Sequence, residues 1–371
     1  MYTKIVIYIS LLLLSILTFS QAEDVKVLPI GSPAPDFNLL GIDDKYHTLQ
    51  SYRDADILVI IFTANHCPTA QAYEDRMIQL VNDYKNKSVA FIAISSNNPD
   101  AVRLDEMGYT DLGDSFEDMK QRAKDKKYNF PYLYDGDEQK ALIAYGPMST
   151  PHVFIFDKER KCRFTGRIDD SEDNTKVTQK DTRNAIEALL TGKPVPVKTT
   201  KTFGCSMKWI SKKASAVEAM KKWNAEEVGV EMIDVEGIGK LLKNDSDKLR
   251  LINVWATWCG PCVSEFPELI EINRMYRLRD FEMVTISADW PEKNDEVLKF
   301  LKKNYASTKN YHFNSKDKYA LVEAVDKEWP GALPYTLLVK PGGDIIYKKL
   351  GMIDPLELKK AIVNYVGRVY P

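Results

Sequence analysis

Apolar runs and helical patterns alternate along the chain in an order that occurs twice. A near-continuous apolar run opens each copy, and such runs are typical of a strand buried on both faces of a sheet. A helical pattern and then a second apolar run follow. These elements cover residues 56–64, 74–84 and 89–96 in the first copy, and 248–256, 267–276 and 281–288 in the second. Strand, helix and strand at this spacing predict a βαβ unit with a parallel sheet.

The second half of each copy also repeats. A proline opens a β-rich run, a turn and another strand follow, and an amphipathic helix closes the copy. These elements cover 150–157, 162–169 and 179–191 in the first copy, and 333–340, 344–351 and 355–367 in the second. The repeat predicts an α/β chain of two tandem domains, each with a central mixed β-sheet flanked by helices.

The 371 residues suffice for two domains with separate cores. We expect the domains to cover residues 23–195 and 226–371, joined by a linker and a connecting helix over 196–225. Prolines, threonines and lysines between 191 and 209 indicate an extended connection. The first copy is longer between its cysteine and its proline, and the excess lies in the polar stretch 97–114. We expect this stretch to be a surface insertion.

Residues 1–22 have the features of a cleaved signal peptide. Lys4 precedes an apolar stretch of about 15 residues, shorter than the roughly 20 that span a bilayer, and small residues follow at Ser20–Ala22. We therefore expect an exported protein that works in the periplasm or outside the cell. The net charge is −2 and no long basic tract occurs, so the sequence predicts no nucleic-acid partner.

The cysteine spacing in the second copy indicates redox chemistry. Cys259 and Cys262 form a CxxC motif between a predicted strand and a predicted helix. At a helix start, unpaired amides and the helix dipole stabilise a thiolate at Cys259, and Cys262 is close enough to displace a mixed disulfide formed there. A zinc site would need two more ligands, and the second copy offers only His312 beyond the pair. We therefore expect no metal and no organic cofactor.

Residues 226–371 resemble the thioredoxin fold and its TlpA/ResA group. The resemblance rests on WCGPC after a predicted buried strand and on Leu-Pro about seventy residues later. The resemblance implies a redox-active disulfide in a thiol–disulfide oxidoreductase, with disulfide-containing substrate proteins and a membrane thiol reductant as electron donor. It also implies a cis Pro334 beside the cysteines and a proton-transfer role for Glu265. Asn253 replaces the buried aspartate of cytosolic thioredoxins. The alternative is that Glu265 faces solvent at the helix N-terminus.

The first copy resembles the redoxin superfamily, on its peroxiredoxin-like (AhpC/TSA) side, over roughly residues 26–209. The resemblance rests on GSPAPDFNL near the start and on NHCP around a single active-site cysteine, Cys67. It implies a peroxiredoxin-like antioxidant activity, although Ala64 and Ile60 stand where true peroxiredoxins carry a threonine or serine and a proline. Two interpretations stay open: Cys67 reacts with a small oxidant, or it exchanges with the second domain.

Three neighbours of Cys67 are candidate accessory residues, namely His66, Pro151 and His152. Cys67 has the same helix-start position as the first CxxC cysteine, with Pro68 next, so the helix dipole favours its thiolate. An imidazolium at either histidine would lower the pKa further. Alternatively, His66 points to solvent and His152 packs beside Pro151. In another interpretation, Cys67 and both histidines hold copper, since thiolate and imidazole suit that metal.

The other two cysteines have different predicted roles. Cys162 lies at an apolar strand position and is predicted to be a buried small hydrophobe. Cys205 lies in FGCSMKW, and the branch that the first copy resembles carries a similar motif after its last helix. Cys205 is therefore either the resolving partner of Cys67 or a packed linker cysteine. Two further alternatives are a relay from Cys67 to Cys259, and a redox-silent first domain that recruits substrates for the second.

Overall fold

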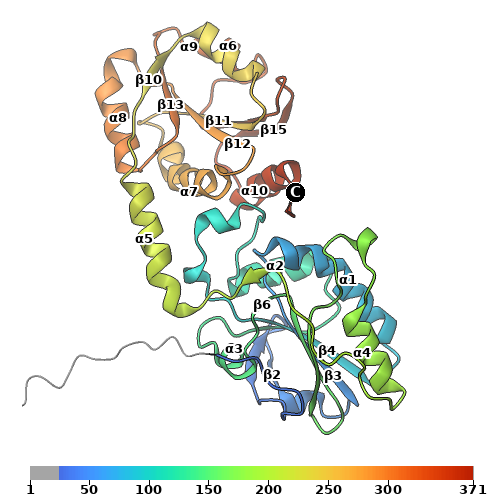
Figure 1. Ribbon diagram of the computed structural model, residues 1–371. Helices are drawn as coiled ribbons and strands as arrows, with labels where there is room; N and C mark the ends of the chain where they lie inside the picture. Colours follow the sequence, from blue (N-terminus) through green and yellow to red (C-terminus); the bar gives the residue numbers. More distant parts are fainter. Residues whose placement is uncertain (1–24, 371) are drawn as a thin grey trace, which may run out of the picture.

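The computed structural model describes residues 25–370 (Figure 1). The predicted signal peptide lies outside these residues. None of the helices in the described part of the chain combines the length and the apolar character that a membrane crossing requires. Two separate sheets, each with helices packed on it, make up the chain, and the α5 helix (Lys213–Asn224) joins the two halves (Figure 1).

The sheet of domain one has seven strands in the order β2-β1-β5-β4-β3-β7-β8. β4 pairs in parallel with β3 and β5, whereas the remaining neighbours pair antiparallel. The strands are β1 (Asn38–Gly41), β2 (Tyr46–Thr48), β3 (Ile57–Phe62), β4 (Val89–Ser95), β5 (Tyr132–Tyr134), β7 (His152–Phe156) and β8 (Cys162–Gly166). The helices are α1 (Pro68–Tyr84), α2 (Phe116–Lys126), α3 (Lys140–Tyr145) and α4 (Asp181–Leu190).

The sheet of domain two has six strands in the order β10-β13-β12-β11-β14-β15. The first four are parallel, and β14 and β15 are antiparallel to their neighbours. The strands are β10 (Glu231–Ile233), β11 (Leu249–Trp255), β12 (Phe281–Ser287), β13 (Lys309–Phe313), β14 (Tyr335–Val339) and β15 (Ile345–Leu350). The helices are α6 (Val235–Lys243), α7 (Gly260–Tyr276), α8 (Asn294–Lys303), α9 (Lys318–Val325) and α10 (Pro355–Val366). Both sheets are mixed and flanked by helices, which confirms the predicted fold class.

The apolar runs explain which strands are central. Every residue of β3 and of β11 is buried, as continuous apolar sequence predicts for a strand covered on both faces. The helices that follow begin at the cysteines, as predicted, because Cys67 and Cys259 are the N-cap residues of α1 and α7. A proline in the first turn is compatible with this start, since the first helical amides need no partner within the helix.

The segment expected to be a linker is extended but belongs structurally to domain one. Thr199 forms a bridge with Thr165 of β8, and the short strand β9 (Cys205–Ser206) pairs antiparallel with β6 (Ser149–Thr150). The predicted connecting helix is α5 (Lys213–Asn224). Several residues before α5 therefore pair their backbone with domain one as well as leading towards domain two.

The polar stretch 97–114 was expected to be a surface insertion, and that prediction is wrong. The stretch lies between the two domains (Figure 1), where Leu104 and Met107 pack against the core of domain two. The Tyr276 hydroxyl donates a hydrogen bond to the carbonyl of Thr110 at 2.6 Å. Several of its polar residues are buried, among them Asp111, which pairs with Arg368 of domain two, and Asp114, which bonds to His66 beside the cysteine site.

Candidate active site

The CxxC cysteines lie at the start of α7 and form a disulfide. Cys259 is the N-cap residue, and the backbone N–H of Cys262 lies 3.3 Å from its Sγ. Cys259 is 5% exposed, whereas Cys262 is fully buried. An attacking group therefore reaches Cys259 first, and an amide that donates to this sulfur would stabilise its thiolate in the reduced protein.

Glu265 follows Cys262 by one turn of α7 and is buried. Its Oε1 accepts a hydrogen bond from the Asn253 side chain at 3.2 Å, and its Oε2 accepts one from the Ile353 amide at 2.8 Å. Burial raises the pKa of the Glu265 carboxyl, and these two hydrogen bonds offset only part of the effect. The interpretation in which Glu265 faces solvent is therefore wrong. A carboxyl of raised pKa suits proton exchange with a cysteine.

A cis proline lies opposite each helix-start cysteine. Thr150–Pro151 and Leu333–Pro334 are both cis peptide bonds, which confirms the expectation for Pro334. Pro151 immediately precedes β7, and Pro334 immediately precedes β14. Each of these strands pairs with the strand that leads to the cysteine of its domain. The two domains therefore present one cysteine and one cis proline in the same arrangement.

Cys67 is fully buried at the N-cap of α1. Its Sγ accepts a hydrogen bond from the Ala70 amide at 3.4 Å and lies 3.3 Å from the carbonyl oxygen of Thr150. Burial alone would raise the pKa of the Cys67 thiol. The hydrogen bond with Cys205 and the charge of His66 outweigh burial and lower that pKa to about 6.

Cys205 is brought to Cys67 by β9. It stands opposite Thr150 in the β6–β9 pair and packs against the small buried cluster that contains Cys67. The hydrogen bond to Cys67, followed by burial, raises the pKa of Cys205 far above its ordinary value. The two pKa shifts have opposite directions, so ionisation is favoured at Cys67 and disfavoured at Cys205.

His66 is buried beside Cys67 and pairs with Asp114, a residue that the sequence analysis missed. Its Nδ1 lies 2.6 Å from Asp114 Oδ2, and Asp114 Oδ1 accepts hydrogen bonds from the Asn65 and His66 amides. Burial would lower the pKa of His66, but the charge and the hydrogen bond of Asp114 raise it. The solvent-facing interpretation of His66 is therefore wrong. No local pattern marks Asp114, because its partners lie far away in the sequence.

His152 and Cys162 have packing roles. His152 Nδ1 accepts the Met148 amide at 3.0 Å and its Nε2 lies 2.9 Å from the Thr165 hydroxyl, while burial lowers the pKa of this imidazole to about 4. A neutral His152 supplies no imidazolium charge to Cys67. Cys162 is fully buried, and burial raises the pKa of its thiol to about 12. Its predicted role as a small hydrophobe is confirmed.

The copper interpretation lacks its ligands. Within residues 25–370, no group of three or more histidine, cysteine or acidic side chains is arranged to hold a metal ion. Both ring nitrogens of His152 already have protein partners.

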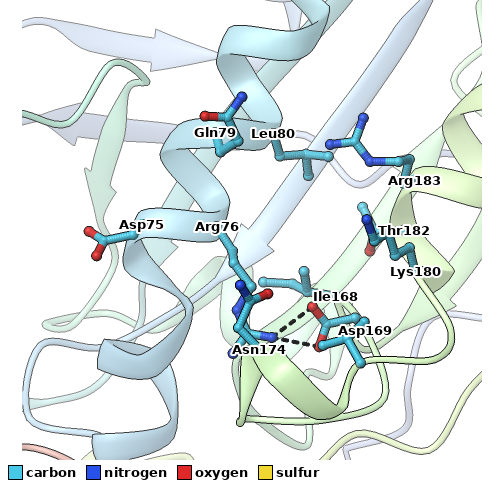
Figure 2. Close-up of a pocket in the computed structure, with 11 residues that line it drawn as sticks. Asp75, Arg76, Gln79, Leu80, Ile168, Asp169, Asn174, Lys180, Thr182 and Arg183 are labelled. Atoms are coloured by element: carbon cyan, nitrogen blue, oxygen red, sulfur yellow. Dashed lines mark hydrogen bonds and ion pairs between the residues drawn. The ribbon is translucent and has the colours of Figure 1, made fainter.

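A hollow between α1 and α4 lies apart from this chemistry (Figure 2). Its lining includes neither cysteine nor histidine. Arg76 donates to both carboxylate oxygens of Asp169, at 2.8 and 2.9 Å, and to the Ser171 carbonyl. These bonds tie α1 to the segment before α4, and we assign the hollow a structural role.

The C-terminal end of domain two reaches the cysteine pair of domain one. Arg368 forms an ion pair with the buried Asp111 of the 97–114 stretch. Tyr370 packs edge-on against Tyr109 of the same stretch, with ring centroids 4.9 Å apart, and its hydroxyl lies 3.9 Å from Cys205 Sγ. Access to Cys205 is therefore limited by a residue from the other domain.

The geometry defines a chain of two domains in which a helix-start cysteine faces a cis proline. The AhpC/TSA family profile matches residues 30–165, and the Redoxin family profile matches residues 230–362. The chain is therefore a tandem protein of the redoxin class, with an AhpC/TSA-family domain followed by a redoxin domain, both of thioredoxin-like fold.

Several known proteins are similar to parts of this chain. The thiol-disulfide oxidoreductase ResA of Oceanobacillus iheyensis is 28% identical over 117 residues, or 31% of this chain and 51% of that protein. The thiol:disulfide interchange protein CycY of Rhizobium leguminosarum bv. viciae is 29% identical over 116 residues, or 31% of this chain and 57% of that protein. The chain thus spans about half the length of these relatives. A conserved protein of known structure from Geobacillus kaustophilus is 38% identical, with a TM-score of 0.45 over 50% of this chain and 94% of that one.

Proposed function

We propose that this protein is an exported thiol–disulfide oxidoreductase whose Cys259–Cys262 pair exchanges with disulfides in substrate proteins. The observation that carries the proposal is the disulfide at the start of α7, with Cys259 the more exposed sulfur and Glu265 buried one turn further on. The names of the curated relatives, which include thiol-disulfide oxidoreductase and thiol:disulfide interchange protein, support the same activity.

In the reducing direction, the Cys259 thiolate attacks a substrate disulfide and one substrate sulfur leaves as a thiolate. Cys262 then loses its proton to Glu265 and attacks the mixed disulfide, which releases the second substrate sulfur and forms the Cys259–Cys262 disulfide. Two electrons pass to the substrate. A thiol reductant, which we expect to be a membrane protein, must restore the dithiol.

Alkylation of the reduced protein near neutral pH tests the assignment of the nucleophile. Iodoacetamide should label Cys259 before Cys262, as followed by peptide mass spectrometry over time. Cys162, buried and of raised pKa, serves as an internal unreactive control. Faster labelling of Cys262 would contradict the assignment.

We further propose that Cys67 and Cys205 form a second redox couple that reacts with a hydroperoxide. The Cys67 thiolate attacks the peroxide oxygen, the O–O bond breaks, and Cys67 becomes a sulfenic acid as an alcohol or water leaves. The Cys205 thiol then attacks the sulfenic sulfur and releases water, which forms the 67–205 disulfide. The contact of Cys205 with Cys67, and the opposite directions of their pKa shifts, favour this function.

A further inference from the structure

The polar stretch 97–114 contacts domain two on one side and the cysteine site of domain one on the other. In Figure 1 it lies between the two sheets, next to α7 and α10. Arg279, just after α7, makes the central contact. Its Nη1 donates to the Gly108 carbonyl at 2.7 Å, its Nη2 donates to the Val366 carbonyl at 2.5 Å, and its guanidinium carbon lies 3.6 Å from the centre of the Tyr109 ring. Arg279 therefore ties the stretch to the end of α10.

The backbone of the stretch lies directly on the end of α7. A Cβ atom at Gly108 would lie 2.9 Å from the Met275 carbonyl oxygen, so this close approach leaves no room for a side chain. The buried Tyr276 hydroxyl donates to the Thr110 carbonyl at 2.6 Å. Arg279 and Tyr276 both bond to backbone carbonyls, so they fix the path of the chain rather than one side chain.

The same stretch is bonded to the chain on both sides of Cys67. The Gln71 side chain, about one helical turn after the cysteine on α1, donates to the Tyr109 carbonyl at 3.1 Å. The Asn65 side chain, just before the cysteine, donates to the Gly113 carbonyl at 2.8 Å. The segment that domain two holds therefore also holds the residues around the nucleophile.

Asp114 ends the stretch and comes shortly after Asp111, which pairs with domain two. Asp114 Oδ2 lies 2.6 Å from His66 Nδ1 and accepts a hydrogen bond from the Asn97 side chain at 2.8 Å. The side chains of His66 and Asp114 are 1% and 0% exposed, so water cannot take the place of the carboxylate. The position of Asp114 therefore decides whether the His66 imidazole carries a proton beside Cys67.

Other charged or titratable groups also surround Cys67 and His66. We call residues 203–208, FGCSMK, the strap. The groups come from the 97–114 stretch, the strap and the C-terminal segment, and they are Asp114, Cys205, Lys208 and Tyr370. Lys208 is paired with Glu106 of the stretch at 2.7 Å, and Tyr370 of domain two lies against Cys205. Each of these groups therefore lies on a segment of the interface between the domains or contacts one.

We propose that docking of domain two controls the reactivity of Cys67, and that Arg279 is a positioning residue for this site, acting through residues 108–114. The proposal deepens the peroxide chemistry proposed above and rests on it for its biological role. With Arg279 bound to the stretch, Asp114 is held against His66, and the protonated imidazole stabilises the Cys67 thiolate. When the contact opens, His66 gives up its proton to water and the thiolate loses its neighbouring positive charge. Movement of domain two therefore switches Cys67 between a reactive and a less reactive state.

Titration of the Cys67 thiol tests the proposal without an oxidant. The protein is the full-length chain carrying Cys205→Ser, Cys259→Ser and Cys262→Ser, and the ultraviolet absorbance of the thiolate is followed between about pH 4 and pH 9. Cys162 stays in place, because burial raises its pKa to about 12 and keeps it a thiol throughout this range. The same chain with Cys67→Ser gives the blank.

Two substitutions at the interface should move the midpoint of this titration. Arg279→Ala should raise it by about one pH unit, which makes the Cys67 thiolate about tenfold rarer below the midpoint, because the thiolate loses a nearby positive charge. Tyr276→Phe keeps the buried ring, removes only its hydrogen bond to the stretch, and should raise the midpoint by less. Arg277→Ala is the matched control, since Arg277 pairs with Glu226 and should leave the midpoint unchanged.

Equal midpoints in Arg279→Ala and Arg277→Ala, with both proteins folded by circular dichroism, would overturn the proposal and leave the peroxide chemistry standing. If Arg279→Ala does not fold, Tyr276→Phe decides, and an unchanged midpoint in that variant overturns the proposal. A raised midpoint, together with a chain of native cysteines that forms no 67–205 disulfide with hydrogen peroxide, would support the control by domain two and overturn the peroxide function.

Discussion

The two cysteine sites share one backbone arrangement and differ in where the second sulfur originates. Cys67 and Cys259 are both N-caps of 17-residue helices, and each accepts a hydrogen bond from the amide three residues on. That third residue is Cys262 in domain two but Ala70 in domain one. Domain one obtains its second sulfur from Cys205, which β9 places beside the cis proline.

The proton chemistry differs as well. In domain two the ionisable group is Glu265, on the helix after the cysteines, and it has no partner of opposite charge. In domain one it is the His66–Asp114 pair, before the helix, and Asp114 comes from the stretch between the domains. In the proposed functions, therefore, the fold fixes the nucleophile at a helix start, whereas the resolving sulfur and the proton-handling group come from different parts of the chain.

The largest effect is expected from loss of the CxxC nucleophile. Cys259→Ser should lower turnover in a protein-disulfide reduction assay by at least about 10³-fold, because Cys262, the other cysteine of domain two, is fully buried and cannot begin exchange. Cys162→Ala is the matched control, since that thiol is buried away from both sites. Retention of most activity in Cys259→Ser would show that domain one carries the reaction.

Loss of the buried acid of domain one should mainly change stability. Asp114→Asn leaves His66 without its partner, and removal of one member of a buried ion pair costs roughly 3–5 kcal/mol in the free energy of unfolding. Denaturant titration measures the change. Asp100→Asn, which breaks an exposed ion pair with Lys213, should cost less than about 1 kcal/mol.

The pH dependence of this loss has a defined window. The pKa of Asp114 is lowered from 3.8, so its contribution is complete above that value and falls away in acid. The pKa of His66 is raised from 6.5, so its contribution is complete below 6.5 and is lost as pH rises through the raised value. The difference between wild type and Asp114→Asn should therefore be greatest between these two pH values. A difference that grows at alkaline pH would contradict the ion pair.

Glu265→Gln should slow disulfide exchange by about 10²-fold, because the amide cannot accept the proton of Cys262. Burial raises the pKa of Glu265 in the folded protein. Ionisation of Glu265 therefore lowers the stability of the folded state as pH rises through this raised pKa. The variant should therefore gain thermal stability relative to wild type in alkaline buffer, by about 2–4 °C in Tm.

Glu268→Gln, on the same helix and paired with Lys359 near the surface, is the control for this experiment. An unchanged rate in Glu265→Gln, or a Tm difference independent of pH, would argue against proton exchange at Glu265.

The smallest effect concerns the residue that covers the strap. Tyr370→Ala should increase the rate at which iodoacetamide labels Cys205 by a few-fold, since the Tyr370 hydroxyl lies 3.9 Å from that sulfur. Mass spectrometry of the labelled peptide follows the change, and Tyr365→Ala on α10 is a half-exposed control. Equal labelling rates would show that β9, rather than the C-terminal residues, limits access.

The sequence predicted the features that depend on local pattern. The equivalent central strands of the two domains, β3 and β11, were predicted because continuous apolar runs correspond to full burial. The CxxC motif was recognised because its spacing places the two sulfurs one helical turn apart. Short strands such as β1 and β5 were missed, since three or four residues carry no measurable period.

The parts that depend on distant contacts were harder to predict. Asp114 reads as one polar residue among many, and its role arises only when the 97–114 stretch folds back onto His66. The same stretch was misread as a surface insertion because polar sequence does not show that residues such as Asp111 and Asp114 have buried protein partners. Cys205 became a candidate only through the resemblance of its surrounding motif.

Disulfide mapping of the oxidised protein tests the central claim most directly. Reduced wild-type protein treated with two equivalents of hydrogen peroxide, one for each disulfide, then alkylated and digested without reductant, should yield two crosslinks, 67–205 and 259–262. A 67–259 crosslink would instead support a relay between the domains. A Cys67 that remains free while Cys259 and Cys262 are joined would contradict the claim that each helix-start cysteine has its own partner.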